Sequence, residues 1–203
     1  MKIRIALVVC AALVLGALGA FLTLKPSEGD AGQVRTEGQA LIGGPFQLID
    51  HTGRTVTDAD FRGKFMLVLF GYTYCPDICP TELQVMTSAM NALGEKASRV
   101  APVFITIDPE RDTEQQLASY VKSFHSQLVG LTGSPAAAAA AAKAYRVYAS
   151  KVKDASSAAD YLMDHSAFIY LMGPDGRYVT HFNYGVTPEK MAEVLNLHLN
   201  SIL

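Results

Sequence analysis

Six consecutive apolar residues, 65–70 (FMLVLF), lie between Gly63-Lys64 and Gly71. A strand with one face in water alternates apolar and polar side chains, whereas a strand covered on both faces is apolar throughout. The run therefore predicts a buried strand at the centre of an α/β sheet.

Strands and helices alternate through the rest of the chain. Apolar spacing, caps and a run of seven alanines predict helices over about 80–93, 113–124, 135–148 and 187–202. Apolar runs and glycine-containing turns predict strands at 100–107 and 128–131, and hairpins at 46–56 and 167–182. Residues 150–160, small and polar, are expected to form a loop. This order is typical of an α/β, thioredoxin-like fold with a central sheet flanked by helices.

Local signals predict where two of the helices start. Pro80 lacks an amide hydrogen, so it is expected at the first helical position, with Cys79 next to the cap and Glu82 as an acid in the first turn. Thr113 and Gln116 have the spacing of a capping box, in which each side chain bonds the other residue's backbone.

Composition limits the class of protein. Half of the 203 residues are apolar and 18% are charged, which excludes an intrinsically disordered chain. The formal net charge is −2, and no basic cluster follows the first few residues, so a dedicated nucleic-acid binder is not expected. Three cysteines are too few for a disulfide scaffold.

The N-terminal segment predicts a membrane anchor over residues 1–26. Lys2 and Arg4 precede twenty uncharged residues, 5–24, and a helix of that length crosses the roughly 30 Å hydrocarbon core of a bilayer. The basic residues before the run predict a cytoplasmic N-terminus and an extracytoplasmic domain. A cleaved signal peptide is the alternative, because residues 17–19 (ALG) resemble a cleavage site.

The remainder of the chain divides in two. Residues 27–41 are rich in Gly, Ser, Glu and Gln, and they are predicted to form a flexible linker. Residues 42–203 are predicted to form the folded domain, because their number is usual for a single domain.

Cys75 and Cys79 lie between the central strand and the helix that follows it. In open α/β sheets, ligands bind beyond the carboxyl ends of the strands, so a site is expected here. The free amides and the dipole of a helix N-terminus lower thiol pKa values. A lowered pKa favours metal ligation and disulfide exchange equally. An inert disulfide is a third interpretation in an extracytoplasmic protein.

Two thiolates from one short loop suit a soft ion such as Cu(I), whereas structural zinc usually needs four ligands. A mononuclear site would take its third ligand from elsewhere in the chain. Of the five histidines, His165 is the preferred candidate, because in a thioredoxin-like topology its loop packs beside the first strand–helix turn. The neighbouring Asp164 is expected to help fix the tautomer of the ring. A structural loop histidine is the alternative interpretation.

Three motifs, in this order, resemble the Sco/SenC family. They are 70–81 (FGYTYCPDICPT), 107–113 (IDPERDT) and 164–171 (DHSAFIYL). The resemblance covers essentially all of residues 42–202 and extends to the anchor. It implies a membrane-tethered copper-binding protein of cytochrome c oxidase assembly, with ligands at Cys75, Cys79 and His165. Tyr74 stands where many members carry histidine, and the Cys-x-x-Cys of thioredoxins is absent.

The function implied by this resemblance is that of a copper metallochaperone. It would receive copper from an upstream copper donor. The copper would be bound as Cu(I), and Cu(II) would be the second oxidation state. By ligand exchange it would deliver the metal to the copper centre of oxidase subunit II. The domain would lie in the periplasm, held by a single pass through the inner membrane. The alternative function is a thiol–disulfide oxidoreductase that reduces the cysteines of that copper centre, and a peroxidase has little support.

Overall fold

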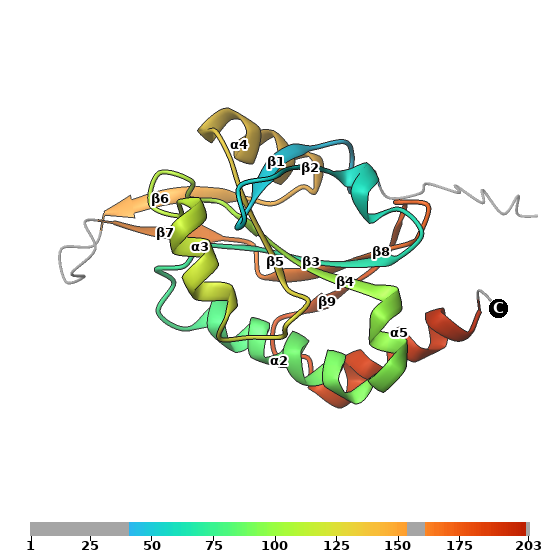
Figure 1. The fold of residues 1–203 in the computed structure, drawn as a ribbon. Coiled ribbons are helices and arrows are strands. Elements are labelled where there is room, and N and C mark those ends of the chain that lie inside the picture. The colour runs from blue at the N-terminus through green and yellow to red at the C-terminus, as the bar shows by residue number, and fades with distance from the viewer. Residues whose placement is uncertain (1–40, 154–160, 202–203) are drawn as a thin grey trace, which may run out of the picture. The chain divides into compact units, whose positions relative to one another are not determined.

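Strand β3 (Phe65–Gly71) lies inside a seven-stranded mixed sheet (Figure 1). The other strands are β1 (Gln47–Asp50), β2 (Thr55–Thr57), β4 (Val100–Thr106), β5 (Val129–Thr132), β8 (Phe168–Met172) and β9 (Tyr178–Asn183). Their order across the sheet is β2-β1-β5-β4-β3-β8-β9. β3 pairs in parallel with β4, and β4 with β5, whereas the other pairs are antiparallel.

The structure is a computed structural model that describes residues 41–153 and 161–201. The predicted anchor, 1–26, and nearly all of the predicted linker, 27–41, lie outside these residues. Within the described ranges, no helix combines the length and the apolarity needed to cross a bilayer.

Helices cover both faces of the sheet. They are α2 (Ile78–Ala92), α3 (Glu114–Val121), α4 (Pro135–Ala144) and α5 (Pro188–Asn200), with short 3₁₀ helices η1 (Asp58–Phe61) and η2 (Gly94–Arg99). Leu67 and Leu69 of β3 pack in one core with α2, α3 and α5, whereas Val68 and Phe70 pack in a second core with α4. Figure 1 shows α2 and α5 below the sheet and α4 above it. Burial on both faces explains the continuous apolar run and confirms the predicted α/β, thioredoxin-like arrangement.

Helix α2 begins two residues earlier than its proline predicts. Its N-cap is Asp77, so Cys79 and Pro80 are the second and third residues of the first turn. Proline is tolerated there because the first amides of a helix have no acceptor within it. Glu82 consequently lies beyond the third position, where it is fully buried.

The predicted loop at 150–160 is in part a hairpin. Strands β6 (Ala149–Lys153) and β7 (Tyr161–His165) pair antiparallel as a separate two-stranded sheet, at the left of Figure 1. β6 is mostly exposed, and its sequence, ASKVK, lacks the apolar alternation that identifies a half-buried strand. Residues 154–160, also assigned to the loop, lie outside the described part of the chain.

Two further details of the helices differ from expectation. α4 ends at Ala144 rather than near Tyr148, and Arg146 then adopts a left-handed φ of 59°. Thr113 caps α3 by accepting a hydrogen bond from the Gln116 amide, as predicted. The side chain of Gln116, however, donates to the Thr73 hydroxyl (3.1 Å), and the amide of Thr113 donates to the Arg111 carbonyl instead of to Gln116.

Candidate metal centre

The loops that follow β3 and β4 meet at one edge of the sheet because the two strands are parallel. Asp112, in the loop after β4, is buried and accepts hydrogen bonds from the amide (3.0 Å) and the hydroxyl (2.6 Å) of Thr73. The hydroxyl of Thr106, the last residue of β4, donates a third hydrogen bond to the same carboxylate (2.6 Å). This carboxylate therefore fixes the start of the cysteine loop against the neighbouring strand.

The two cysteines, both free thiols, lie in different environments. Cys75 is half-buried in the loop, whereas Cys79 is fully buried in the first turn of α2. The backbone amide of Cys79 donates to Cys75 Sγ (3.4 Å). Gly71, at the end of β3, provides the space for the buried sulfur. A Cβ at this position would lie 2.6 Å from Cys79 Sγ and 2.8 Å from the ring of Phe104.

His165, the last residue of β7, directs its ring toward the thiols. Its Nε2 lies 3.5 Å from Cys79 Sγ, and its Nδ1 lies 2.9 Å from the carbonyl oxygen of Ser166. A carbonyl oxygen can only accept, so Nδ1 carries a proton, and Nε2 is the nitrogen that can present a lone pair to a metal once it has no proton of its own. The Ser166 carbonyl thus takes the role expected of Asp164, whose side chain is exposed.

The ligand atoms of Cys75, Cys79 and His165 all lie within 4.8 Å of one another. The structure therefore brings together the three side chains that the sequence singled out. The other histidines lie outside this cluster, with contacts of their own: His51 to Gly130, His125 to Gln127, His181 to Tyr178 and His198 to Phe65.

The three groups differ in protonation. A hydrogen bond with Cys79 lowers the pKa of Cys75 to about 4, although burial opposes this shift. The same contact, together with burial, raises the pKa of Cys79 above its ordinary value. Burial lowers the pKa of His165, but hydrogen bonds to Cys75 and Ser166 outweigh it, and the net shift is upward. In the metal-free site, the thiolate is therefore on Cys75.

Two sulfurs and one imidazole nitrogen form a soft donor set of low coordination number. Cu(I) favours such donors, whereas a closed zinc site has four ligands. Within the described residues, no further cysteine, histidine or carboxylate joins the three in the cluster. The arrangement suits a soft cation, and the free dithiol also suits disulfide exchange.

A groove of about 490 Å³ opens beside this cluster. Cys75 and His165 line it with neighbours from the cysteine loop and the β6–β7 hairpin: Tyr72, Pro76, Asp77, Ile78, Val152, Leu162, Met163 and Asp164. Cys79 is buried and is not among the lining residues. A partner molecule in the groove would therefore meet Cys75 and His165 first.

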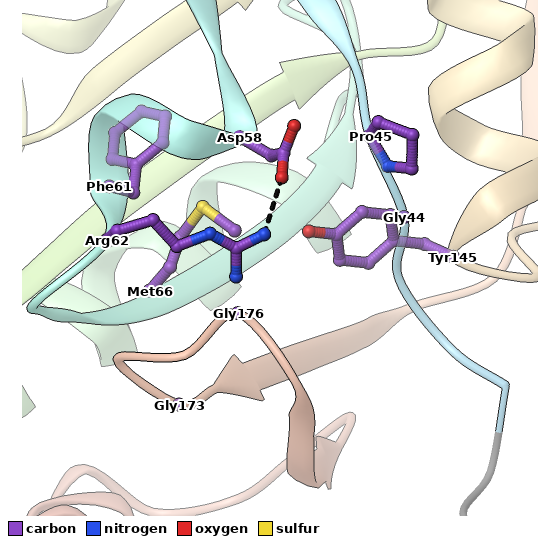
Figure 2. Close-up of a pocket in the computed structure, with 9 residues that line it drawn as sticks. All are labelled: Gly44, Pro45, Asp58, Phe61, Arg62, Met66, Tyr145, Gly173 and Gly176. Carbon is purple, nitrogen blue, oxygen red and sulfur yellow. Dashed lines mark hydrogen bonds and ion pairs between the residues drawn. The ribbon is translucent and has the colours of Figure 1, made fainter.

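Figure 2 shows a different cavity, of about 220 Å³. It is lined in part by Met66, near the start of β3, whereas the cysteines follow the end of that strand. Arg62 points into it and pairs with Asp58 (2.7 Å), so the charges that line it are compensated. Neither cysteine nor histidine lines this cavity, and it is not part of the candidate metal centre.

Two aromatic residues of the site, Tyr72 and Tyr161, are not among those that the sequence indicates. The buried Tyr72 meets the His165 ring edge-on, with centroids 5.9 Å apart and planes at 86°. Tyr161, in the same hairpin as His165, has Arg111 3.7 Å from its ring centroid. The position of Tyr72, between the central strand and Cys75, could have indicated that it belongs to the site. No local pattern could have indicated Tyr161, because its contact with Arg111 joins segments 50 positions apart in the chain.

Comparison with known proteins identifies relatives of the chain. A family model described as SCO1/SenC matches residues 34–200. Protein sco1 of Schizosaccharomyces pombe is 45% identical over 162 residues, covering 79% of this chain and 62% of that protein. The chain therefore spans less than two thirds of the length of this relative.

Solved structures share the fold. ScoI of Bradyrhizobium japonicum, solved with copper bound, is 48% identical with a TM-score of 0.72, covering 77% of this chain and 99% of that one. BsSco, described as a member of the Sco family of cytochrome c oxidase assembly proteins, has the same fold at 24% identity and a TM-score of 0.62, with coverages of 79% and 94%. The family match, the identities and the shared fold agree, and the chain belongs to the SCO1/SenC family.

Proposed function

We propose that this chain is a copper metallochaperone that holds Cu(I) between the sulfurs of Cys75 and Cys79 and the Nε2 of His165. The observation that carries the proposal is the convergence of the three donor atoms within 4.8 Å. Two thiolates and an imidazole match the softness of Cu(I) and its low coordination number. The copper bound to the similar ScoI of B. japonicum supports the choice of metal. Cu(II) is the second state that the site would hold.

The same geometry favours transfer of the metal. Three ligands leave Cu(I) able to accept one more, so a donor atom of a partner can bind before the first ligand leaves. Cys75 and His165 line the open groove, and they are the ligands that such a partner reaches. The family description of BsSco supports a role in cytochrome c oxidase assembly. We propose that the protein receives copper from an upstream copper donor and delivers it to subunit II of that oxidase.

We place the protein in the inner membrane, with residues 42–203 in the periplasm. The uncharged run 5–24, preceded by Lys2 and Arg4, supports an anchor over residues 1–26. Residues 27–41 would then act as a tether that keeps the copper site near a membrane-embedded oxidase.

A thiol–disulfide reductase is the second candidate function, and the lowered pKa of Cys75 favours it. The Cys75 thiolate would attack one sulfur of a substrate disulfide, forming a mixed disulfide and releasing the other substrate sulfur as a thiolate. Cys79, after loss of its proton, would then attack Cys75 Sγ. The products are a Cys75–Cys79 disulfide and a fully reduced substrate dithiol.

Titration of the reduced full-length protein with Cu(I), against a competing chelator, tests the first function. We expect one Cu(I) per chain and an X-ray absorption spectrum with two sulfur ligands and one nitrogen ligand. Cys75→Ser and Cys79→Ser should each abolish tight binding. His181→Ala, which removes an exposed histidine outside the cluster, is the matched control and should bind as wild type does. A wild-type chain that takes up no Cu(I), or holds it without sulfur ligands, contradicts the proposal.

A further inference from the structure

The β6–β7 hairpin carries His165 but does not belong to the seven-stranded sheet. Among the residues that the structure describes, its two strands pair only with each other. A two-stranded hairpin by itself is marginally stable in water, and β6 is largely exposed. The distance between His165 and the thiols therefore depends on the contacts that fasten this hairpin to the rest of the domain.

Arg111, in the loop after β4, makes several of these contacts. Its Cζ lies 3.7 Å from the ring centroid of Tyr161, the first residue of β7, and Nη1 donates to the Tyr161 carbonyl (2.9 Å). Its Nε donates to the carboxylate of Asp108 (2.5 Å), which is only 1% exposed. The Tyr161 hydroxyl donates to the other oxygen of Asp108 (2.8 Å). Arg111 and Asp108 thus hold the ring, the carbonyl and the hydroxyl of one hairpin residue.

The guanidinium of Arg111 also faces the cysteine loop. Its Cζ lies 4.9 Å from the ring centroid of Tyr74 and 5.7 Å from that of Tyr72. Tyr72 in turn contacts the ring of His165. Arg111 therefore lies between the two segments that must stay together for the sulfurs and the imidazole to converge. A planar guanidinium can stack on an aromatic ring while its N–H groups donate outward in the same plane, whereas an ammonium group has no plane with which to stack.

We propose that Arg111 is a positioning residue of the copper site, which holds the β6–β7 hairpin so that His165 stays within reach of the thiols. Arg111 is not one of the proposed ligands and acts through Tyr161 and Tyr72. This inference rests on the proposed function, because Arg111 can position a copper ligand only if His165 is one.

The first measurement uses the metal-free full-length protein. Arg111→Gln removes the charge and the stacking group, and hydrogen–deuterium exchange follows the peptides that cover residues 149–165. We expect exchange in this hairpin to rise about tenfold. Arg54→Gln is the matched control, because Arg54 also pairs with a buried carboxylate, Asp50 (2.8 Å), beside the other hairpin, β1–β2. It should leave exchange in 149–165 unchanged.

The second measurement reads the ligands of the bound metal. X-ray absorption of the Cu(I)-loaded Arg111→Gln variant should show two sulfur ligands with the nitrogen lost, and Cu(I) affinity should fall about tenfold. Arg54→Gln should keep all three ligands. A purely structural role for Arg111 lowers stability without changing the ligand set.

The outcomes separate this inference from the proposed function. Unchanged exchange in Arg111→Gln overturns the inference, and so does a looser hairpin with the nitrogen ligand retained. If wild type binds no Cu(I), the proposed function fails, while exchange in the metal-free protein still decides whether Arg111 holds the hairpin. If Arg111→Gln does not fold, Tyr161→Leu removes the ring on which Arg111 stacks, and it should raise hairpin exchange about threefold; no rise overturns the inference.

Discussion

The Nε2 of His165 lies 3.5 Å from the Sγ of Cys79, although 86 positions separate the two residues in the chain. The carbonyl of Ser166, which binds Nδ1 at 2.9 Å, keeps the ring from turning Nε2 away. The donor atoms are therefore arranged before a metal arrives. A preorganised site binds with little cost of rearrangement.

Replacing His165 with alanine should separate the two candidate functions. We expect Cu(I) affinity to fall by roughly 100-fold, because a ligand is lost. Disulfide exchange should largely survive, because both sulfurs remain. Competition titration and exchange with oxidised glutathione, on the same preparation, check both expectations. Wild-type Cu(I) affinity in this variant would remove His165 from the site.

The reactivity of Cys75 should depend on pH in the acidic range. Its pKa of about 4 means that the thiolate persists at neutral pH and is lost as the pH falls through about 4. In the unfolded chain the thiol titrates near its ordinary value of 9.0, so the stabilising effect of this shift is complete above that value and is lost as the pH falls toward 4. Iodoacetamide labelling of the reduced, metal-free protein, mapped to the Cys75 peptide, should be half-maximal near pH 4. A midpoint near 9.0 would contradict the shift.

Gly71→Ala should disturb both the core and the site. The added Cβ would lie 2.6 Å from Cys79 Sγ, so we expect a loss of about 1–3 kcal/mol in the free energy of unfolding, measured in urea. Cu(I) affinity should also decrease, since the buried sulfur must move. Gly44→Ala is the control: its Cβ would meet only Ala144, at 3.4 Å, and the change should stay within about 0.5 kcal/mol. Equal effects of the two substitutions would show that the space beside Cys79 is not critical.

Asp112→Ala should loosen the cysteine loop. It leaves the amide of Thr73 and the buried hydroxyl of Thr106 without their acceptor, which we expect to cost about 1–3 kcal/mol of stability. Asp112→Asn is the matched control, because one amide oxygen still accepts and the Thr73 hydroxyl can accept from the new NH₂ group. Urea unfolding of both variants makes the comparison. A loss in the Asn variant as large as that in the Ala variant would mean that the charge, not the bonding, matters.

Patterns among neighbouring residues were sufficient for most of the fold. The apolar run of β3, the cap of α3 and the position of Cys75 and Cys79 after a central strand could all be predicted, because each depends on residues close in the chain. The start of α2 was predicted two residues late, since a proline in the first turn fits more than one position.

The sequence by itself determined the α/β order, the two thiols at the carboxyl end of a strand and the soft character of any metal they bind. Only the tertiary structure decided that the β6–β7 hairpin forms and that Arg111 lies between Tyr161 and the cysteine loop, and it places His165, the histidine that the sequence favoured, against the sulfurs. Those contacts join segments dozens of positions apart, and their distances follow from the order of strands in the sheet. Local composition does not reveal these pairings: β6 is polar and unpatterned, and the apolar start of β7, residues 161–163, does not indicate which segments it contacts.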